Sequence, residues 1–270
     1  MRDSKKSLSR EELAEYDGTD RVISSYQLEE SIKLRDGEDQ GLCIKSGIPA
    51  LDRHTEGFRE GELIVISGPT GQGKTLFAQT ITAHITNRED PQHPLWFSFE
   101  MPPKQFFRCF PSVPFFYMPQ ELKPYKWKWF EERCLENEAK HGGRVIITDH
   151  LHFLFEFFRT GSPSLEIGRL LRKLKRLAVD NNYIVFLIAH ISKLPKGEKA
   201  GLHHIRDSSF IGQESDTVLM IQRIEDRKKG KKNRSCITVE KCRWTGVFGE
   251  QVYVNKVGGY LRELTDEFSL

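Results

Sequence analysis

The sequence is poor in cysteine, and its few cysteines lie far apart. Five occur in 270 residues, and no two of them form a C-x-x-C pair. Disulfide frameworks and cysteine-based zinc sites need thiols that are paired or clustered in this way. We therefore expect a reduced, cytosolic type of protein without a structural zinc site. The five are Cys43, Cys109, Cys134, Cys236 and Cys242.

Long apolar runs and an excess of charge of one sign are also missing. No run of about 18 apolar residues occurs, so we expect no membrane-spanning helix and no membrane partner. Residues 1–18 are charged and lack the apolar core of a signal peptide. The net charge of +3 is too small to indicate a polyanionic partner by itself. With 38% hydrophobic and 29% charged residues, the composition is typical of a soluble globular protein.

Residues 1–40 form a polar segment ahead of a domain that we place at 41–270. The stretch "SREE" at 9–12 predicts a helix start, because Ser9 and Glu12 can cap each other's backbone amides. Residues 20–37 predict a second helix, which could dock elsewhere, pack on its own domain or fray. Its apolar side chains are predicted to share one side of the helix: Val22, Ile23, Tyr26, Ile32 and Leu34.

From residue 42 on, short apolar runs alternate with helical stretches. Continuous apolar runs of this length are typical of strands buried on both faces, so an α/β fold with a mostly parallel sheet flanked by helices is expected. The end of the chain alternates instead, which predicts a C-terminal antiparallel β extension over 235–243, 250–256 and 259–264. The predicted buried strands are 62–67, 95–100, 144–149, 183–189 and 216–222, and the predicted helices are 74–87, 102–110, 125–140 and 165–181.

The stretch "GPTGQGKT" at 68–75 matches the P-loop pattern G-x-x-x-x-G-K-[ST] and stands between a predicted strand and a predicted helix. Glycines let backbone amides wrap a phosphate chain at a helix N-terminus. The lysine can reach the β and γ phosphates, and the threonine can hold Mg²⁺. The nucleotide-binding residues predicted here are Gly68, Pro69, Thr70, Gly71, Gln72, Gly73, Lys74 and Thr75.

Three further candidates stand at the ends of predicted strands. Asp149 could hold the metal ion, Glu100 could accept a proton from an attacking water, and His190 could sense the γ-phosphate. The alternatives are a capping aspartate, a surface glutamate and a strand-end histidine with an ordinary hydrogen bond. His150 and His152 in "DHLHF" lack clustered partners in the sequence, so a metal site there is not favoured.

The stretch "VEKCRWTG" at 239–246 places Lys241 and Arg243 two residues apart, so on a strand both would point to one face. Two adjacent cations repel each other and need an anionic partner. The spacing leaves open whether the chain itself or an outside partner supplies that anion, and Lys241 could pair with a nearby carboxylate.

Several of these segments, in this order, resemble a known family. "GIPALDRHTEGFREGELIVISGPTGQGKT" looks like the entry to a RecA-type ATPase core, and "SFEM", "VIITDHLHFLF", "FLIAHISK", "HIRDSSFIGQESDTVLMIQR" and "KCRWTG" follow. Together they resemble the C-terminal helicase domain of the DnaB family, over roughly residues 20–262. The branch of phage primase–helicases and mitochondrial Twinkle is the most similar, since it has a histidine in the place of His190.

The resemblance implies a RecA-like P-loop NTPase that forms a ring, usually of six subunits, around one DNA strand. It also implies that the helix near residues 20–36 is a linker helix that packs against a neighbouring subunit. It implies that Lys74 and Thr75 bind phosphate and Mg²⁺, that Glu100 is the catalytic base, and that Asp149 and His190 complete the site. Arg223, which ends "DTVLMIQR", joins the predicted nucleotide-binding residues. Arg243, and with it Lys241, would reach the γ-phosphate held by the adjacent subunit, so we expect their anion to lie outside the chain.

The resemblance also gives the basic segment 190–209 a role. A basic loop suits a sugar–phosphate backbone, so single-stranded DNA contact is predicted there, with a solvated loop as the alternative. The predicted DNA-binding residues are Lys193, Lys196, Lys199 and Arg206. Residues 156–164 are a weaker candidate, the run 227–234 is open between a partner contact and a solvated loop, and 169–177 reads as an ordinary exposed helix.

The expected function is an NTP-dependent replicative DNA helicase, working with ATP or another nucleoside triphosphate and Mg²⁺. The alternatives are a RecA/KaiC-like regulatory or recombination ATPase and a nucleotide-gated scaffold. Primase, polymerase or a loader are possible further partners. The expected location is the cytoplasm or nucleoid of a phage-infected or bacterial cell, with the mitochondrial matrix left open.

Overall fold

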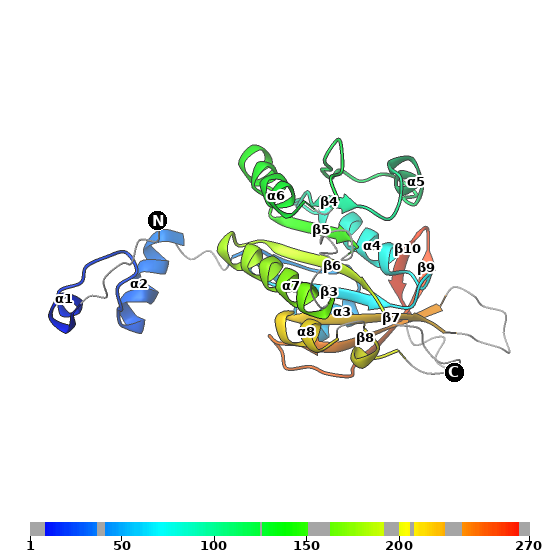
Figure 1. Ribbon diagram of the computed structural model, residues 1–270. Helices are drawn as coiled ribbons and strands as arrows, with labels where there is room; N and C mark the ends of the chain where they lie inside the picture. The colour runs from blue at the N-terminus through cyan, green and yellow to red at the C-terminus, as the bar shows by residue number, and fades with distance from the viewer. Residues whose placement is uncertain are drawn as a thin grey trace. The chain divides into compact units, whose positions relative to one another are not determined.

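The computed structural model describes residues 9–36, 41–124, 126–150, 163–191, 200–205, 208–224 and 234–264. The chain divides into two compact units, Met1–Gly41 and Leu42–Leu270 (Figure 1). Among the described helices, none has the length and apolar character needed to cross a bilayer.

The first unit contains two helices, α1 (Arg10–Ala14) and α2 (Ser25–Asp36). The predicted capping box is confirmed, since the Ser9 side chain accepts from the Glu12 amide and the Glu12 carboxylate accepts from the Ser9 amide. A second box, formed by Ser24 and Gln27, begins α2. Because α2 starts at Ser25, the prediction that Val22 and Ile23 belong to its apolar side was wrong.

The second unit is built on an eight-stranded sheet with the strand order β10-β9-β8-β7-β3-β6-β5-β4. The strands from β7 to β4 in this order are mutually parallel, and β8, β9 and β10 continue the sheet in antiparallel fashion. The predicted fold class is therefore confirmed. The strands are β3 (Leu63–Gly68), β4 (Leu95–Ser98), β5 (Val145–Asp149), β6 (Ile184–His190), β7 (Thr217–Arg223), β8 (Arg234–Cys242), β9 (Gln251–Val257) and β10 (Tyr260–Glu263).

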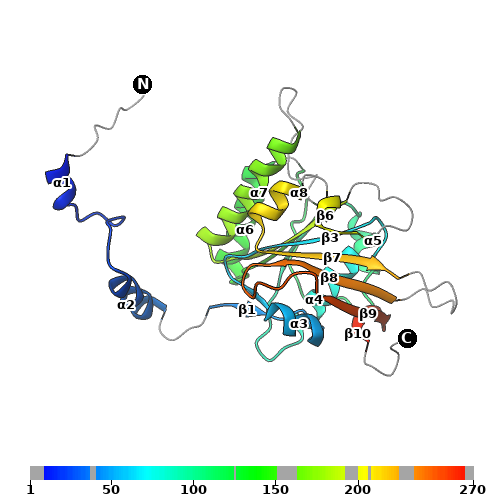
Figure 2. The same cartoon turned by 90° about the horizontal axis from the view of Figure 1, so that it is seen from below.

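Helices cover both faces of this sheet, which explains why the strands are apolar without alternation (Figures 1 and 2). Along β3, Ile64 and Ile66 enter one core, whereas Leu63 and Val65 enter the other. The first core is shared with α3 (Pro49–Thr55), α4 (Lys74–Thr86) and α5 (Pro103–Arg108), and the second with α6 (Trp127–His141), α7 (Pro163–Asp180) and α8 (Ser208–Glu214). Beside them lie a 3-10 turn, Leu202–His204, and a two-stranded ribbon of β1 (Cys43–Ile44) and β2 (Phe58–Arg59).

The register of the strands decides which residues meet at each edge of the sheet. Gly68 pairs with His190, and Asp149 pairs with Ser98 and Ile188, so the ends of four strands lie together at the carboxyl edge. At the opposite edge, Thr217 at the start of β7 pairs with Cys242 at the end of β8. The P-loop and Arg243 therefore lie at opposite edges of the sheet.

Candidate active site

The P-loop leaves β3 through a backbone conformation that only glycine can adopt at this position. Gly68 has φ +150°, and a Cβ atom there would lie 2.1 Å from the carbonyl oxygen of Ile221. Gly73, with φ +104°, is the N-cap of α4. The loop therefore presents the free amides of the first turn of α4 to the space above the sheet edge, an arrangement that favours anions.

Lys74 lies folded across this loop. Its side chain is buried, and Nζ donates hydrogen bonds to the carbonyl oxygens of Gly68 (2.9 Å) and Pro69 (3.0 Å). Burial lowers the pKa of Lys74, while the charges of Glu100 and Asp149 act in the opposite direction. The ammonium group is thus held where the loop would place a phosphate chain.

Thr75 and Asp149 bring two hard oxygen ligands together. The Thr75 hydroxyl donates to Asp149 Oδ2 at 2.7 Å. Asp149 Oδ1 is buried, and no described residue hydrogen-bonds it. Burial, and to a smaller degree the charge of Glu100, raises the pKa of Asp149 to about 6, although the Thr75 hydrogen bond opposes the shift. A carboxylate and a hydroxyl in this arrangement fit Mg²⁺, which prefers oxygen ligands.

Glu100, His150 and His190 form a cluster beside this pair. Glu100 Oε2 lies 3.5 Å from His150 Nδ1 and 3.5 Å from His190 Nε2, and the two imidazole rings pack edge to face at 4.4 Å. Burial, and next the charge of Lys74, lowers the pKa of His190, which favours the neutral imidazole. The prediction that His150 lacks clustered partners was wrong, because adjacent parallel strands place it there. His152 lies outside the described residues.

Arg223 contacts the P-loop through its backbone. The Arg223 amide donates to Gln72 Oε1 at 2.7 Å, and so ties the end of β7 to the loop. The structure therefore places Arg223 next to the predicted nucleotide-binding residues, with its side chain exposed.

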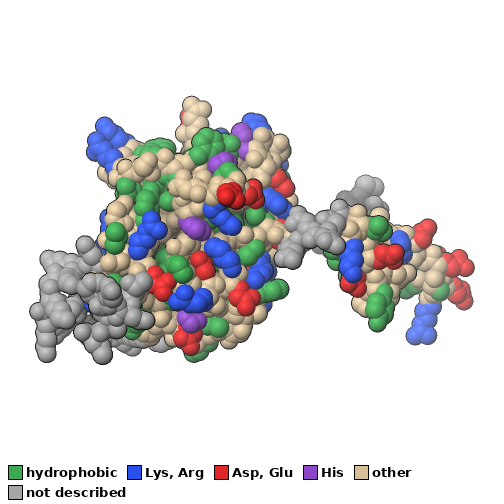
Figure 3. Space-filling model, turned by 180° about the vertical axis from the view of Figure 1, so that it is seen from behind, with side chains coloured by type: hydrophobic (Ala, Val, Ile, Leu, Met, Phe, Trp, Pro, Cys, Tyr) green, Lys and Arg blue, Asp and Glu red, His purple; other side chains and the backbone are tan. Residues whose placement is uncertain are grey.

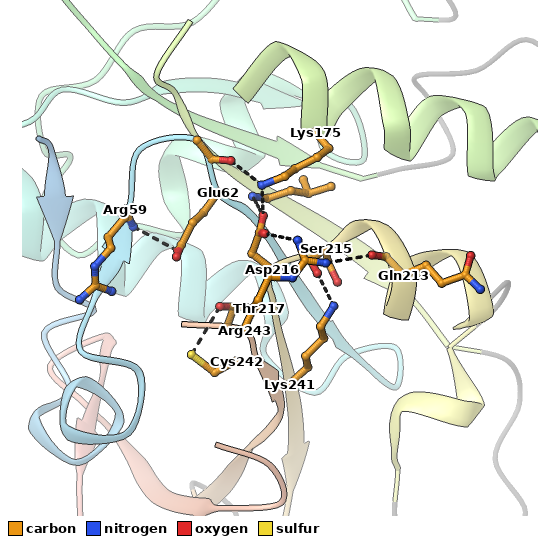
Figure 4. A network of polar contacts seen from close by, with 12 residues as sticks. Arg59, Glu62, Lys175, Gln213, Ser215, Asp216, Thr217, Lys241, Cys242 and Arg243 are labelled. Atoms are coloured by element: carbon orange, nitrogen blue, oxygen red, sulfur yellow. Dashed lines mark hydrogen bonds and ion pairs between the residues drawn. The ribbon is translucent and has the colours of Figure 1, made fainter. Parts of the chain in front are cut away.

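The chain itself supplies the anion that faces Arg243, which corrects our expectation (Figure 4). Arg243 Nη1 lies 3.0 Å from Asp216 Oδ1, and Nη2 donates to the carbonyl oxygen of Gln213. The Asp216 side chain is only 7% exposed, whereas that of Arg243 is 54% exposed. Asp216 Oδ2 also accepts from the Leu63 amide and from Lys175 Nζ. The carboxylate is thus a buried anchor that holds one half-exposed arginine.

Lys241 plays a different part from Arg243 in the same network (Figure 4). Its Nζ donates to the carbonyl oxygens of Gly212 (2.7 Å) and Ser215 (2.6 Å) at the C-terminal end of α8. These are carbonyl partners and not the carboxylate that we considered. Arg243 lies just beyond β8, and the register of β8 shifts at Glu240, so the two cations are not a simple i, i+2 strand pair.

The predicted DNA-binding residues Lys193, Lys196, Lys199 and Arg206 lie outside the described residues, as do residues 156–162 and 225–233. On the described part of the face in Figure 3, cationic and anionic side chains are interspersed, without a broad field of one sign. The basic face of α7 carries ordinary surface ion pairs, such as Arg169–Glu166 and Arg176–Asp180. Lys175 is the exception, because it joins the Asp216 network.

Sequence reasoning missed three residues of these two clusters: His150, Lys175 and Asp216. Each contact joins residues far apart in the chain, for example Asp216 with Leu63. The only local signal was the position of His150 directly after the strand-end Asp149.

Comparison with known proteins places these features in context. Residues 43–111 and 121–256 match the family described as "DnaB-like helicase C terminal domain". The replicative DNA helicase DnaB of Geobacillus stearothermophilus is 23% identical over 254 residues, covering 82% of this chain and 55% of that protein. The replicative DNA helicase DnaC of Bacillus subtilis (strain 168) is 22% identical with the same coverage. The chain thus spans about half the length of these curated relatives.

Two solved structures share the fold. A DnaB-like replicative helicase, studied with its interactions with primase, superposes with a TM-score of 0.74 at 19% identity and covers 92% of this chain and 69% of that one. A second structure, solved as an isolated ATPase domain, has a TM-score of 0.74 at 18% identity and covers 89% of this chain and 97% of that one.

Proposed function

Because the chain belongs to the family of DnaB-like helicase C-terminal domains, we propose that it is the nucleotide-hydrolysing motor of a ring-shaped replicative DNA helicase. The observation that carries this proposal is the set of groups at the carboxyl edge of the sheet: Lys74, the Thr75–Asp149 pair and the Glu100–His190 pair. Membership in the phage primase–helicase and Twinkle branch stays a prediction.

The P-loop residues would bind and orient the triphosphate. Amides of the loop and of the first turn of α4 would surround the phosphates, with the Lys74 ammonium beside the β and γ phosphates. Thr75 and Asp149 would hold Mg²⁺, which neutralises phosphate charge when bound. ATP is the proposed substrate. Another nucleoside triphosphate would make the same contacts, because the P-loop binds the phosphates and not the base.

Glu100 is the proposed general base. Its carboxylate is partly exposed and stands two residues beyond β4, where it can accept a proton from a water that attacks the γ-phosphate. His190, kept neutral by burial and by Lys74, could donate one hydrogen bond to the γ-phosphate. Strands buried on both faces hold these groups, so their positions are set by the core.

Arg243 would act on the nucleotide of a neighbouring subunit. It lies at the edge of the sheet opposite to the P-loop, which makes contact with its own nucleotide unfavourable. Asp216 accepts from Nη1 and the Gln213 carbonyl accepts from Nη2, and the Arg243 side chain still remains 54% exposed. An arginine supplied in trans stabilises the charge of the transition state. Lys241 has two carbonyl partners at the end of α8, so we propose that it stabilises the structure around Arg243 and does not contact the nucleotide.

The proposed partners are further copies of the chain and single-stranded DNA. A ring of six subunits would place each Arg243 next to a neighbour's P-loop, and Lys193, Lys196, Lys199 and Arg206 would contact the DNA backbone. The interaction of one structural relative with primase makes primase a candidate partner, besides a polymerase or a loader. A bacterial or phage setting, in the cytoplasm or at the nucleoid, is proposed from the relatives.

Mixed-subunit hydrolysis tests the proposal. Lys74→Ala and Arg243→Ala should each be nearly inactive alone, and mixing them should restore part of the activity. Some interfaces then combine an intact P-loop with an intact arginine. Arg172→Ala is the matched control, since its side chain is 52% exposed and pairs with Glu214; it should keep its activity. No recovery in rings shown to exchange subunits would contradict the trans role.

Unwinding of forked DNA separates the helicase from the RecA/KaiC-like alternative. The helicase should release the displaced strand in a reaction that requires nucleotide and Glu100. Hydrolysis stimulated by single-stranded DNA, without any strand release, would favour the alternative.

A further inference from the structure

Three metal-binding side chains converge from the ends of three neighbouring strands. Glu100 follows β4, His150 follows β5 and His190 ends β6. Each offers one ligand atom, and these three atoms all lie within 4.8 Å of one another. The strands are buried on both faces, so packing in both cores holds the strand ends that carry these side chains.

The distances within this cluster are long for hydrogen bonds. Both imidazole nitrogens lie 3.5 Å from Glu100 Oε2, whereas a nitrogen–oxygen hydrogen bond is about 2.7–3.2 Å long. The same distances suit shared coordination of an ion. In a tetrahedral zinc site with bonds of about 2.1 Å, neighbouring ligand atoms are about 3.4 Å apart. Both distances to Glu100 match this spacing, and the third distance, between the two histidines, lies within 4.8 Å.

We propose that Glu100, His150 and His190 form a binding site for a divalent transition-metal ion of the Zn²⁺ type. Two imidazoles and one carboxylate suit Zn²⁺, Co²⁺ or Ni²⁺ better than Mg²⁺ or Ca²⁺, which prefer oxygen ligands throughout. Three protein ligands also leave a fourth position of a tetrahedral ion open. The site uses other side chains than the neighbouring oxygen pair of Thr75 and Asp149.

Occupation of this site would inhibit the motor. An ion bound by Glu100 withdraws the carboxylate from its role as base, and the same ion takes the nitrogen with which His190 would contact the γ-phosphate. This consequence rests on the proposed function, whereas binding of the ion depends only on the three side chains.

Binding is tested with the metal ion alone. The full chain, carrying Cys43→Ser and Cys109→Ser to remove the two exposed thiols, is titrated with Zn²⁺ by calorimetry and with Co²⁺ by visible absorption. We expect one tight ion per chain and the absorption bands of tetrahedral Co²⁺. His150→Ala should weaken binding by at least ~10-fold, the low end of what even outer partners of a metal site contribute. His150→Gln serves as a second variant if the alanine protein is unstable.

The matched control is His141→Ala, which removes a histidine whose ring stacks on Tyr117 and which belongs to α6. Its affinity for Zn²⁺ should equal that of the parent. The proposal is overturned if the parent binds no stoichiometric ion, or if the His150 and His141 variants bind equally well.

A second arm measures hydrolysis of nucleotide with Mg²⁺ in excess. Zn²⁺ at the concentration that fills the site should inhibit the parent and the His141→Ala protein, and the inhibitory concentration should rise at least ~10-fold in His150→Ala. Stoichiometric Zn²⁺ binding by a chain that hydrolyses no nucleotide would contradict the proposed function and leave the metal site standing. If Zn²⁺ fills the site and the rate of hydrolysis does not change, the inhibitory role is overturned.

Discussion

Burial of the Asp149 carboxyl group lowers the free energy of unfolding when this group is ionised, because folding raises its pKa from 3.8 to about 6. Between these values the unfolded chain has lost the proton while the folded chain still holds it. Stability should therefore fall as pH rises from about 4 to about 6, and then change no further through this group. A shift of about 2 units corresponds to about 3 kcal/mol at most.

We predict that Asp149→Asn stabilises the chain at pH 7 by about 2–3 kcal/mol, because the ionised carboxylate is no longer buried. Urea unfolding in the presence of a chelator, at several pH values, measures the difference between wild type and variant. That difference should grow between pH 4 and 6. Asp180→Asn, at a carboxylate that is 60% exposed, is the control and should show no such trend. A flat difference for Asp149→Asn would contradict the burial argument.

The pair of Asp216 and Arg243 should respond very unequally to mutation. Asp216→Ala removes a 7% exposed carboxylate, which takes the side-chain acceptor from the Leu63 amide and leaves Lys175 with the Gly61 carbonyl but no counter-charge. We therefore expect a loss of about 3 kcal/mol or more in the free energy of unfolding. Arg243→Ala removes a half-exposed partner and should lose about 1 kcal/mol or less. Denaturant unfolding compares the two. Equal losses would mean that Arg243 serves the stability of its own subunit.

The sequence could predict which residues lie together only where their contacts follow from the order of the parallel strands. The convergence of Lys74, Glu100, Asp149 and His190 follows from the rule that parallel strands end at one edge of the sheet. The Asp216–Arg243 contact does not follow from it, because it requires the antiparallel register of β8 against β7 and the register shift at Glu240. The catalytic roles of the four residues remain predictions.

At the scale of elements, the P-loop depends on the close approach of β3 to β7. Gly68→Ala would place a Cβ 2.1 Å from the Ile221 carbonyl at φ +150°. We predict a loss of roughly 3 kcal/mol in unfolding free energy, and weaker nucleotide binding, because the loop must move.

Gly142→Ala is the matched control for this element. Gly142 also has a positive φ (+66°), at the C-cap of α6, but a Cβ there would meet nothing within 4 Å. It should lose about 1 kcal/mol and keep nucleotide affinity. Chemical denaturation and nucleotide titration compare the two variants, and losses of equal size would refute the steric account.

Length explains most of what could be predicted among the helices. The five buried strands were predicted from their continuous apolar runs, and helices α4, α6 and α7 have 13, 15 and 18 residues, enough for an apolar pattern to indicate their type. Helix α5 (Pro103–Arg108) has only six residues, and its position between two apolar runs predicted it. Helices α3 (Pro49–Thr55) and α8 (Ser208–Glu214) have seven residues each, about two turns, so no period could emerge. Tertiary contacts stabilise them instead: Lys241 caps the end of α8, and Leu51 of α3 lies in the core.

For the whole molecule, the proposed role of Arg243 has a consequence for assembly. The P-loop and Arg243 lie at opposite edges of the sheet, so under that proposal a single copy would hold an incomplete site. A closed ring of identical subunits would complete the site, since every head-to-tail interface would combine the two edges. Activity should therefore rise more steeply than in proportion to protein concentration wherever the ring dissociates.

The first unit, Met1–Gly41, allows a test of whether helix α2 holds the subunits together. Helix α2 leaves Tyr26 and Leu34 82% exposed each, and the polar segment that contains it is predicted to pack against a neighbouring subunit. A chain that begins at residue 42 keeps the complete two-faced core, so its melting temperature should not change, but its ring should dissociate at low protein concentration. Sedimentation with bound nucleotide measures this.

Point variants within α2 decide whether the apolar side chains carry the contact. Tyr26→Ser together with Leu34→Ser should weaken the ring as the truncation does, because it removes the apolar surface that burial against a neighbour would stabilise. Lys33→Ala, which only breaks an exposed ion pair with Glu29, should leave assembly intact. If the truncated chain stays hexameric at low concentration, the ring is held by the second unit alone, and α2 serves another purpose.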